Sequence, residues 1–447
     1  MKKIRLSTSH IIMLSFLSAI LLGSLLLALP ISSASGKAVP YIDALFTAGS
    51  ATCVTGLVTV PTFSTWSIFG QIVILLLIQV GGLGIITVMA SFVVFMHRKL
   101  GLSDRVLLQD AFNLNTLSGL GAFVKKVLLG TLLVEGVGAM LYLPVFIKDF
   151  GLRGIWVSVF NSVSAFCNAG FDIIAEDSLC RYATHPLINF VTAALIIVAG
   201  IGYIVWWDVL RVLKDPKLRR WRHLTLHSKI ALTTTAILIF GGALLIFLFE
   251  YRNPQTIGTL PLFDKIQSSL FQSVTTRTAG FAGIPQQNLS EGAAMVSCLL
   301  MFIGGSPVGT AGGVKTVTIA VLLASAFSTV KNKNETVLFH RCISREMIGK
   351  ALAVVTMSAL IAISSTLLLS ATIDAPALDI AYETISATAT VGLTRGITPL
   401  LNSWGKLIII ATMYLGRIGP ISLAIAFNIR TKSPNLIKNP TEQISVG

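Results

Sequence analysis

Four short segments of the sequence share an ending that places backbone carbonyl groups beside a glycine. Each is a Ser-, Thr- or Ala-rich apolar stretch that closes with a small or polar pair, a Gly, and then Leu or Phe. Glycine reaches backbone angles closed to other residues, so successive carbonyl oxygens can face one axis. Rings of such oxygens replace the hydration shell of K⁺. We therefore expect a K⁺ filter made of the tripeptides Val54, Thr55, Gly56; Asn168, Ala169, Gly170; Thr278, Ala279, Gly280; and Thr390, Val391, Gly392.

The four glycines recur at a nearly constant period, with separations of 114, 110 and 112 residues. A recurrence of this kind indicates an internal repeat. The third copy is one residue shorter between Phe271 and Gly280, so its short helix is expected to differ from the other three. The four tripeptides contain no Asp or Glu, which leaves filter carbonyls as the predicted ligands and no side-chain metal site.

The composition indicates a membrane protein. Of 447 residues, 54% are hydrophobic and 12% are charged, whereas a soluble domain carries about 25% charged residues. A transmembrane helix needs about 20 mostly apolar residues. Eight stretches qualify, and the first is preferred as a span over a signal peptide because its apolar run is long. They cover roughly residues 11–33, 67–96, 123–147, 186–210, 229–249, 292–327, 348–371 and 404–428.

Each filter tripeptide follows an apolar segment of about 12 residues, which is too short to cross a membrane and is typical of re-entrant pieces. Non-helical backbone at membrane depth is stable only inside protein or along a water-filled cavity. The predicted fold is an all-α integral membrane protein with eight transmembrane spans around a central pseudo-fourfold pore. It consists of four tandem helix–pore loop–helix units at residues 1–100, 101–222, 223–340 and 341–447, the last with a cytoplasmic C-terminal tail.

The placement of basic residues predicts the orientation. Eight crossings put both termini and every second connection on one side, which holds 23 of the 34 Lys and Arg residues. Nine lie on the opposite side, Arg277 among them. The positive-inside rule then predicts a multi-pass protein of the plasma (inner) membrane with both termini in the cytoplasm. The net charge of +15 is explained by this topology, so no nucleic-acid partner is expected.

Many acidic residues are expected on the outer side. A negative mouth would concentrate cations at the entrance, and ordinary solvated loop charges are the alternative. These residues are Asp43, Asp149, Asp172, Glu176, Asp177, Asp264, Glu291, Asp374, Asp379 and Glu383.

Glycines also cluster in the second span of each unit, at Gly81–Gly84, Gly200–Gly202, Gly304–Gly305 and Gly416–Gly419. We expect most of them to allow helices to approach closely. The third cluster begins a stretch, residues 304–316, that has five Gly and one Pro and cannot form a straight helix.

Thr390-Val391-Gly392-Leu393 resembles the filter signature of K⁺ channels, and four degenerate copies in one chain resemble the Trk/Ktr/HKT superfamily of K⁺ transporters. The resemblance covers essentially the whole chain. Within the superfamily the chain is most similar to the Ktr-type membrane subunits, because the first span leads directly to the first pore loop. Glycine at all four filter positions resembles the K⁺-selective members.

The resemblance implies that the broken sixth span contains an intramembrane gate. The residues concerned are Gly304, Gly305, Ser306, Pro307, Gly309, Thr310, Gly312, Gly313 and Lys315. A static kink is the alternative. Arg417 resembles the pore-facing arginine of the family, which would form an electrostatic barrier or contact the loop. A role in locking two helices through carbonyl hydrogen bonds is the alternative for Arg417, and Glu135 in the third span is a candidate helix-packing partner without an assigned role.

The resemblance further implies K⁺ uptake stimulated by Na⁺ as an activator, a homodimer, and a cytosolic nucleotide-binding regulatory ring of the KtrA-like type. No other cofactor is expected, and the basic loops are expected to contact membrane lipid or a soluble partner. A proton- or Na⁺-coupled symporter remains the alternative function, although such folds usually have two inverted halves and midplane carboxylates. A nucleotide-binding enzyme is disfavoured because Val314 separates Gly313 from Lys315 and breaks the P-loop order.

Overall fold

The computed structural model describes residues 8–85, 87–88, 90–91, 120–215 and 221–419 of the chain. This part is almost entirely helical. Its named strands are β1 (Thr336–Leu338) and β2 (Arg341–Ile343), which form one antiparallel hairpin with Thr336 opposite Ile343. The predicted termini and C-terminal tail, and the loop charges at residues 92–119 and 216–220, lie outside the described residues.

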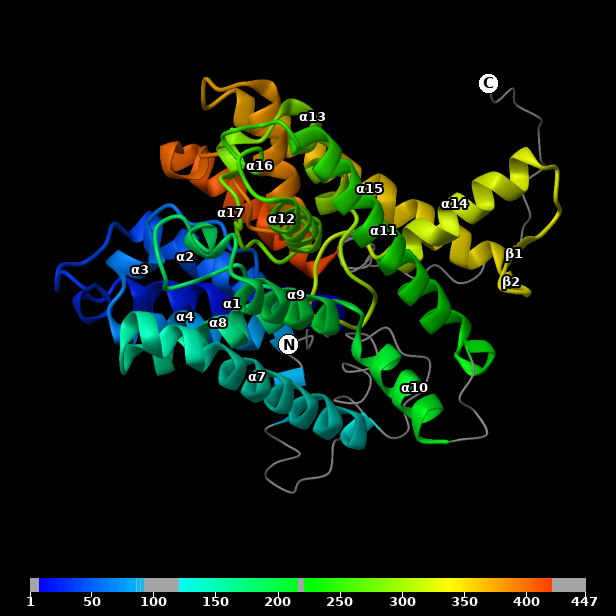
Figure 1. Cartoon of the computed structure of the whole chain (residues 1–447), viewed down its shortest axis with the longest axis horizontal. Coiled ribbons are helices and arrows are strands. Elements are labelled where there is room, and N and C mark those ends of the chain that lie inside the picture. The colour runs from blue at the N-terminus through cyan, green and yellow to red at the C-terminus, as the bar shows by residue number, and fades with distance from the viewer. Residues whose placement is uncertain (1–7, 86, 89, 92–119, 216–220, 420–447) are drawn as a thin grey trace, which may run out of the picture.

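Helices of three kinds recur in the same order four times along the chain (Figure 1). The long first helices are α1 (Thr8–Leu27), α7 (Leu120–Phe150), α11 (Leu226–Glu250) and α15 (Arg345–Ser370). The short helices that follow them are α2 (Tyr41–Cys53), α8 (Arg153–Cys167), α12 (Leu262–Thr275) and α16 (Ala377–Ala389). The last in each group are α4 (Ile68–Leu83), α9 (Pro186–Gly200) with α10 (Tyr203–Lys214), α13 (Glu291–Phe302) with α14 (Thr316–Val330), and α17 (Ser403–Ile418).

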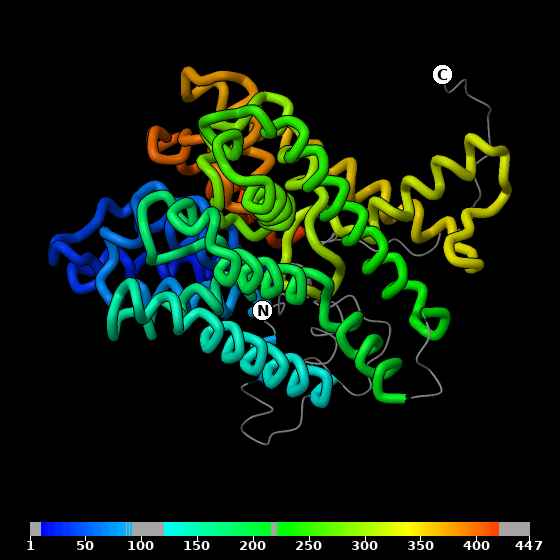
Figure 2. The backbone as a smooth tube through the Cα atoms, viewed as in Figure 1, coloured from blue at the N-terminus to red at the C-terminus, as the bar shows by residue number. Residues whose placement is uncertain are grey.

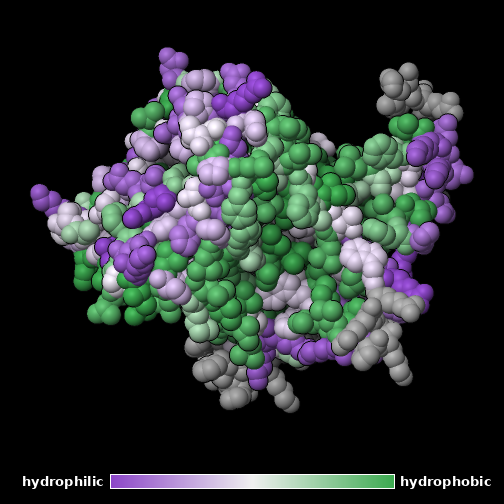
Figure 3. All heavy atoms as spheres, in the orientation of Figure 1, coloured by the Kyte–Doolittle hydropathy of each residue, from purple (hydrophilic) through white to green (hydrophobic). Residues whose placement is uncertain are grey.

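The short helices are buried and the long ones face outward. Ten of the 13 residues of α2 are buried, whereas α7 and α15 expose apolar side chains such as Leu133 and Leu367. Figure 3 shows a broad hydrophobic field across the middle of one face, with hydrophilic residues gathered at its margins. An aqueous surface would not carry so continuous an apolar area. The pattern is that of a protein whose long helices face lipid.

Among the described residues, four helices are long and apolar enough to cross a membrane: α1, α7, α11 and α15. A fifth span is obtained if α9 and α10 are counted together. The remaining second-position helices are shorter, as α4 is, or are interrupted. The structure therefore contains several apolar spans, and a count by length alone falls short of the predicted eight.

The fourth predicted span, residues 186–210, is wrong as a single helix. α9 and α10 meet at an angle of 97°, and Gly202 between them has φ +89°, which other residues rarely adopt. The glycine clusters therefore have two roles. Gly81 and Gly416 lie against the carbonyls of Thr52 and Thr388, as expected for close approach, whereas Gly202 bends the chain.

The interruption of the sixth predicted span is confirmed. α13 ends at Phe302 and α14 begins at Thr316, with irregular backbone between them. Figure 2 shows α14 and the start of α15, in yellow, extending away from the body of the molecule toward the β-hairpin. Short helical turns complete the connections: η1 (Pro30–Ser32), α3 (Thr62–Thr65), η2 (Cys180–Tyr182), η4 (Trp221–His223), η5 (Gln286–Asn288) and η6 (Thr398–Leu400).

Candidate functional site

The four predicted tripeptides meet in a closed ring. A Cβ atom added to Gly56 would lie 2.5 Å from the carbonyl oxygen of Ala169, and one added to Gly170 would lie 2.8 Å from that of Ala279. In the same way, a Cβ atom added to Gly280 would lie against the carbonyl oxygen of Val391, and one added to Gly392 would lie against that of Thr55. Each glycine therefore lies against the residue that precedes the next glycine. Any side chain at these positions would enter the carbonyl ring.

Each tripeptide begins with a non-glycine residue of positive φ. The values are +56° at Val54, +57° at Asn168, +67° at Thr278 and +51° at Thr390. This conformation costs energy and persists only where neighbouring groups hold it. In the first and fourth copies, the amide N–H groups of Gly56 and Gly392 donate to the hydroxyls of serines six residues earlier, in the last turn of each short helix, at 3.0 Å each.

The third copy differs, as its shorter spacing predicted. α12 ends at Thr275, five residues before Gly280, whereas the other three short helices end three residues before their glycines. The Thr275 hydroxyl donates to the carbonyl oxygen of Phe281 at 2.7 Å, in place of the serine contact. Thr276 and Arg277 are therefore outside the helix.

A cavity of about 540 Å³ lies on the side of the ring where the four tripeptides end. It is lined by the four glycines and by Asp172, Glu176 and Asp177, three of the acids predicted for the outer mouth. Asp172 belongs to the outer connection, and burial raises the pKa of its carboxyl to about 6. The cavity is therefore suited to attract cations, most strongly above that pH.

Other acids predicted for the mouth are engaged elsewhere. Asp43 accepts a hydrogen bond from Thr59 and pairs with Lys406 at 2.5 Å, and Asp379 pairs with Arg395 at 2.6 Å. Glu383 is fully buried and accepts a hydrogen bond from Thr398. The Asp43–Lys406 pair joins α2 to α17, and Asp379 and Glu383 of α16 bind residues of the connection that follows that helix. Of the ten acids predicted for the outer side, Asp172, Glu176 and Asp177 are the ones that line the cavity.

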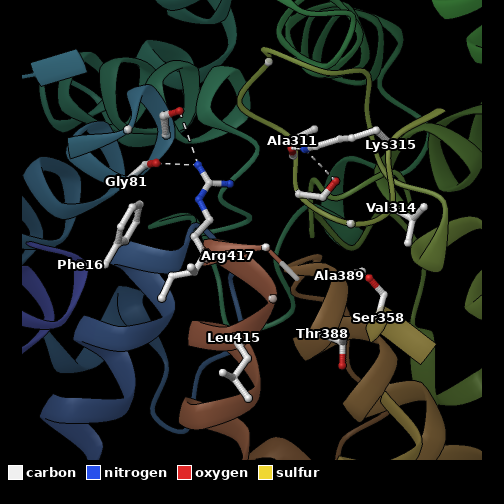
Figure 4. A pocket seen from close by; sticks show the side chains of 18 of the residues that line it. Phe16, Gly81, Ala311, Val314, Lys315, Ser358, Thr388, Ala389, Leu415 and Arg417 are labelled. Carbon is white, nitrogen blue, oxygen red and sulfur yellow. Dashed lines mark hydrogen bonds between the residues drawn. The ribbon is translucent and has the colours of Figure 1, made fainter. Parts of the chain in front are cut away.

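A second cavity, of about 330 Å³, touches the residues that precede the fourth tripeptide, Thr388 and Ala389 (Figure 4). It is lined by the loop 309–315 and by Arg417 at the end of α17. Lys315 donates to the carbonyl oxygens of Ala311 and Gly312, at 2.6 and 3.5 Å. None of the described residues that line this cavity is an Asp or a Glu.

The irregular stretch between α13 and α14 is a loop with a closed base. The amide of Gly304 donates to the carbonyl of Val314 at 2.9 Å, and the amide of Val314 donates to that of Phe302 at 3.1 Å. The amide of Thr316 donates to the carbonyl of Gly305 at 3.0 Å. The base is thus fixed by main-chain bonds, and residues 306–313 project from it.

The tip of this loop contacts the ring and Arg417. The guanidinium of Arg417 donates to the carbonyl of Thr310 at 2.8 Å and to that of Gly81 at 2.5 Å. The Thr310 hydroxyl donates to the carbonyl of Phe166 in α8 at 3.1 Å. Arg417 therefore joins the loop to α4 through hydrogen bonds to main-chain carbonyls.

The remaining loop residues face α9 and α10. The amide of Ser306 donates to the carbonyl of Gly200 at 2.8 Å, and the Ser306 hydroxyl is 2.8 Å from that of Thr316. Ser306 thus lies at the base and does not contact Arg417. Pro307 and Gly309 lie against the bend at Gly202. A Cβ atom added to Gly202 would meet the carbonyl oxygen of Pro307, and one added to Gly309 would meet main-chain atoms of Ala199 and Gly202.

Arg277 was assigned to the outer side by the charge count, and this was wrong. It is 6% exposed, and its guanidinium donates to the carbonyl of Gly304 at 3.1 Å and to the Thr235 hydroxyl at 3.5 Å. The feature of the sequence that could have identified Arg277 as a pore residue is its place immediately before a filter tripeptide. Glu135 accepts from Gln79 at 3.4 Å, and its carbonyl accepts from Ser162, so it joins α7 to α4 and α8 as a packing partner.

Comparison with known proteins gives a consistent result. The model of the TrkH family, "Cation transport protein", matches residues 5–439. The chain is 40% identical to Ktr system potassium uptake protein B of Bacillus subtilis, over 100% of this chain and 98% of that protein. It is 38% identical to potassium/sodium uptake protein NtpJ of Enterococcus hirae, over 99% and 98%. The crystal structure of the potassium transporter TrkH from Vibrio parahaemolyticus superposes with a TM-score of 0.74 at 18% identity, over 95% of this chain and 86% of that one.

Proposed function

The chain belongs to the TrkH cation transport family and is a Ktr-type potassium uptake protein, a transporter and not an enzyme, and from that premise we propose that K⁺ passes through the ring of four glycines. The observation that carries the proposal is the closed ring itself, in which each glycine lies against the carbonyl before the next glycine. Carbonyl oxygens directed at one axis replace water around a dehydrated K⁺ ion.

Each residue of the filter has a defined part in this proposal. The glycines leave space for carbonyls from neighbouring units, and the left-handed residues, such as Val54 and Thr390, turn the chain at the ends of the short helices. The four short helices direct their C-terminal ends, where the helix dipole is negative, toward the ring. This field favours a cation without any carboxylate.

The proposed architecture has eight spans in four units, at residues 1–100, 101–222, 223–340 and 341–447. α1, α7, α11 and α15 are the first spans of the units. α4, α9, α13 with α14, and α17 contribute the second spans, each shortened or broken near the pore. The similarity to TrkH over 95% of the chain supports this arrangement.

We infer that the loop 304–316 is a gate. Its tip lies against the ring, where it is held by hydrogen bonds to Arg417, Phe166 and Thr278, while Val308 packs against the apolar core. Hydrogen bonds of this kind can be exchanged for bonds to other polar groups when the loop moves. The cationic side chains of Lys315 in the loop and of Arg417 beside it would also raise the energy of a passing cation.

The orientation and partners follow from the sequence and the relatives. We propose that both termini are cytoplasmic, that the protein is a homodimer with one pore in each protomer, and that a KtrA-like nucleotide-binding ring regulates it. Cysteine tags placed near Lys333 should then react from the cytoplasmic side, and tags near Asp374 from outside. Labelling of either position from the other side would contradict the orientation.

Cation flux into liposomes that contain the purified protein tests the proposed function. We expect K⁺ and Rb⁺ to enter down their gradients well ahead of Na⁺ and Li⁺, with external Na⁺ raising the K⁺ flux as an activator. Equal flux of all four ions would contradict the carbonyl filter. K⁺ uptake that runs against its own gradient only when a proton or Na⁺ gradient is imposed would instead establish the symporter.

A further inference from the structure

The third filter segment is bonded to both arms of the gating loop. Arg277, immediately before Thr278, donates from Nη2 to the carbonyl oxygen of Gly304 at 3.1 Å. The amide of Gly312 donates to the hydroxyl of Thr278 at 3.2 Å. Gly304 begins the loop and Gly312 lies near its end, so adjacent residues of one filter segment bind the two arms.

Arg277 is an unusual residue for this position. It is 6% exposed, its Nε atom has no hydrogen-bond partner, and among the described residues no carboxylate forms an ion pair with it. A buried guanidinium without a counter-ion is costly. Neutral serine hydroxyls accept hydrogen bonds from the glycine amides of the first and fourth segments, so holding the filter backbone does not by itself require a charge.

The other three units lack this feature. The residues three positions before their filter glycines are Cys53, Cys167 and Ala389, all at the ends of intact helices. In the third unit α12 ends two residues earlier, which frees Arg277 from the helix and lets its side chain reach Gly304. The arginine therefore occurs in the unit whose own second span contains the loop.

We propose that Arg277 is a positioning residue that couples the gating loop to the filter. It holds the start of the loop at Gly304 while it supports the third filter tripeptide, so displacement of the loop and a change in the filter occur together. This inference rests on the proposed function, in which the loop 304–316 obstructs the pathway.

The coupling predicts two separable effects of Arg277→Met, which keeps the length of the side chain and removes its charge and donors. Resting K⁺ flux in liposomes should rise about fivefold to tenfold, because a charge-assisted bond that holds the loop is lost. The preference for K⁺ over Na⁺ should fall in the same preparation. Thr235→Val removes only the other partner of Arg277 and should leave both quantities within about twofold of the unmodified chain.

Combination with deletion of residues 307–312 distinguishes the mechanism. The deletion leaves the base of the loop, and its contact with Arg277 through Gly304, in place. Arg277→Met should then cause no further rise in flux, because no loop remains to be released, but it should still lower selectivity. Thr278→Val, which removes the second tie, provides the same test if the Met variant does not reach the membrane.

Three results would overturn the coupling. A rise in flux of equal size with and without the deletion would mean that the charge acts directly on the ion. A fall in flux in both backgrounds would mean that Arg277 only stabilises the fold. Unchanged flux and selectivity in the full chain, with a deletion that does raise flux, would refute the coupling and leave the gate intact. A deletion without effect would instead refute the gate.

Discussion

The two cavities on either side of the glycine ring have opposite charge. The outer cavity, of about 540 Å³, carries Asp172, Glu176 and Asp177, whereas the inner one, of about 330 Å³, carries Lys315 and Arg417. The ring between them is built from main-chain oxygen throughout. In the proposed function, selection and regulation therefore depend on different chemistry: carbonyls select the ion, and side-chain charges on the two sides set how readily it arrives and leaves.

The two sides should differ in how much each charge matters. Charges at the outer mouth are close to solvent, and salt screens them over about 10 Å at 0.1 M. Arg417 and Lys315 are bonded to backbone carbonyls within the protein, where the effective dielectric is lower and an ion is affected more strongly. Substitutions on the inner side are therefore expected to change flux more than those on the outer side.

Of the changes proposed here, deletion of residues 307–312 on the inner side should have the largest effect on K⁺ flux. Main-chain bonds pair Gly304 with Val314 and Gly305 with Thr316 at the base of the loop, so we expect a chain that joins Ser306 to Gly313 to keep α13 and α14 in place. We expect resting K⁺ flux to rise about tenfold or more and to depend less on a regulatory partner. A deleted protein that inserts normally but transports at the original rate, or not at all, would mean that the loop is a static kink.

Arg417→Gln should have the next largest effect. It removes one of the two cationic side chains of the inner cavity and the bridge from Thr310 to Gly81, so K⁺ flux should rise about threefold to tenfold. Lys350→Gln is the matched control, because Lys350 is exposed and pairs with Glu346 one turn away on the same helix. If the two variants gave the same flux, the inner cavity would not be an electrostatic barrier.

Asp172→Asn should have the smallest effect, about a twofold loss of K⁺ influx at low K⁺ and low ionic strength. Burial raises the pKa of this carboxyl to about 6, so it is charged above that pH and neutral below it. Influx through the unmodified protein should therefore fall as external pH is lowered from about 7.5 to 5. The Asn variant should lose this part of the pH dependence, and an identical pH profile in both proteins would exclude Asp172 from the mouth.

The ring could be predicted from sequence because its determinants are local. Each filter glycine follows a short apolar segment of recognisable length, and the near-constant period identified all four copies. The missing residue before Gly280 predicted that α12 would differ from the other short helices, and α12 ends early, at Thr275. The interruption between α13 and α14 was equally visible, since Gly304–Gly313 lacks the side chains that a helix needs to pack.

Other features depended on partners that are distant in sequence. The bend at Gly202 looks like any small-residue contact until the loop carbonyls that face it are known. Arg277 resembled an outer loop charge because a charge count carries no information on depth. Likewise, Asp43 was counted with the outer acids although its charge is paired with Lys406, which is far away in the chain.

Selection of K⁺ by the carbonyl ring should be visible in the K⁺/Na⁺ flux ratio of Gly56→Ser in liposomes. The added side chain would enter the ring beside the carbonyl of Ala169, so we predict that the ratio falls about tenfold. Gly136→Ser is the control, because Gly136 lies on the exposed face of α7 and an added Cβ meets nothing within 4 Å. A Gly56→Ser protein that transports with the ratio of the unmodified chain would mean that the ring does not select K⁺.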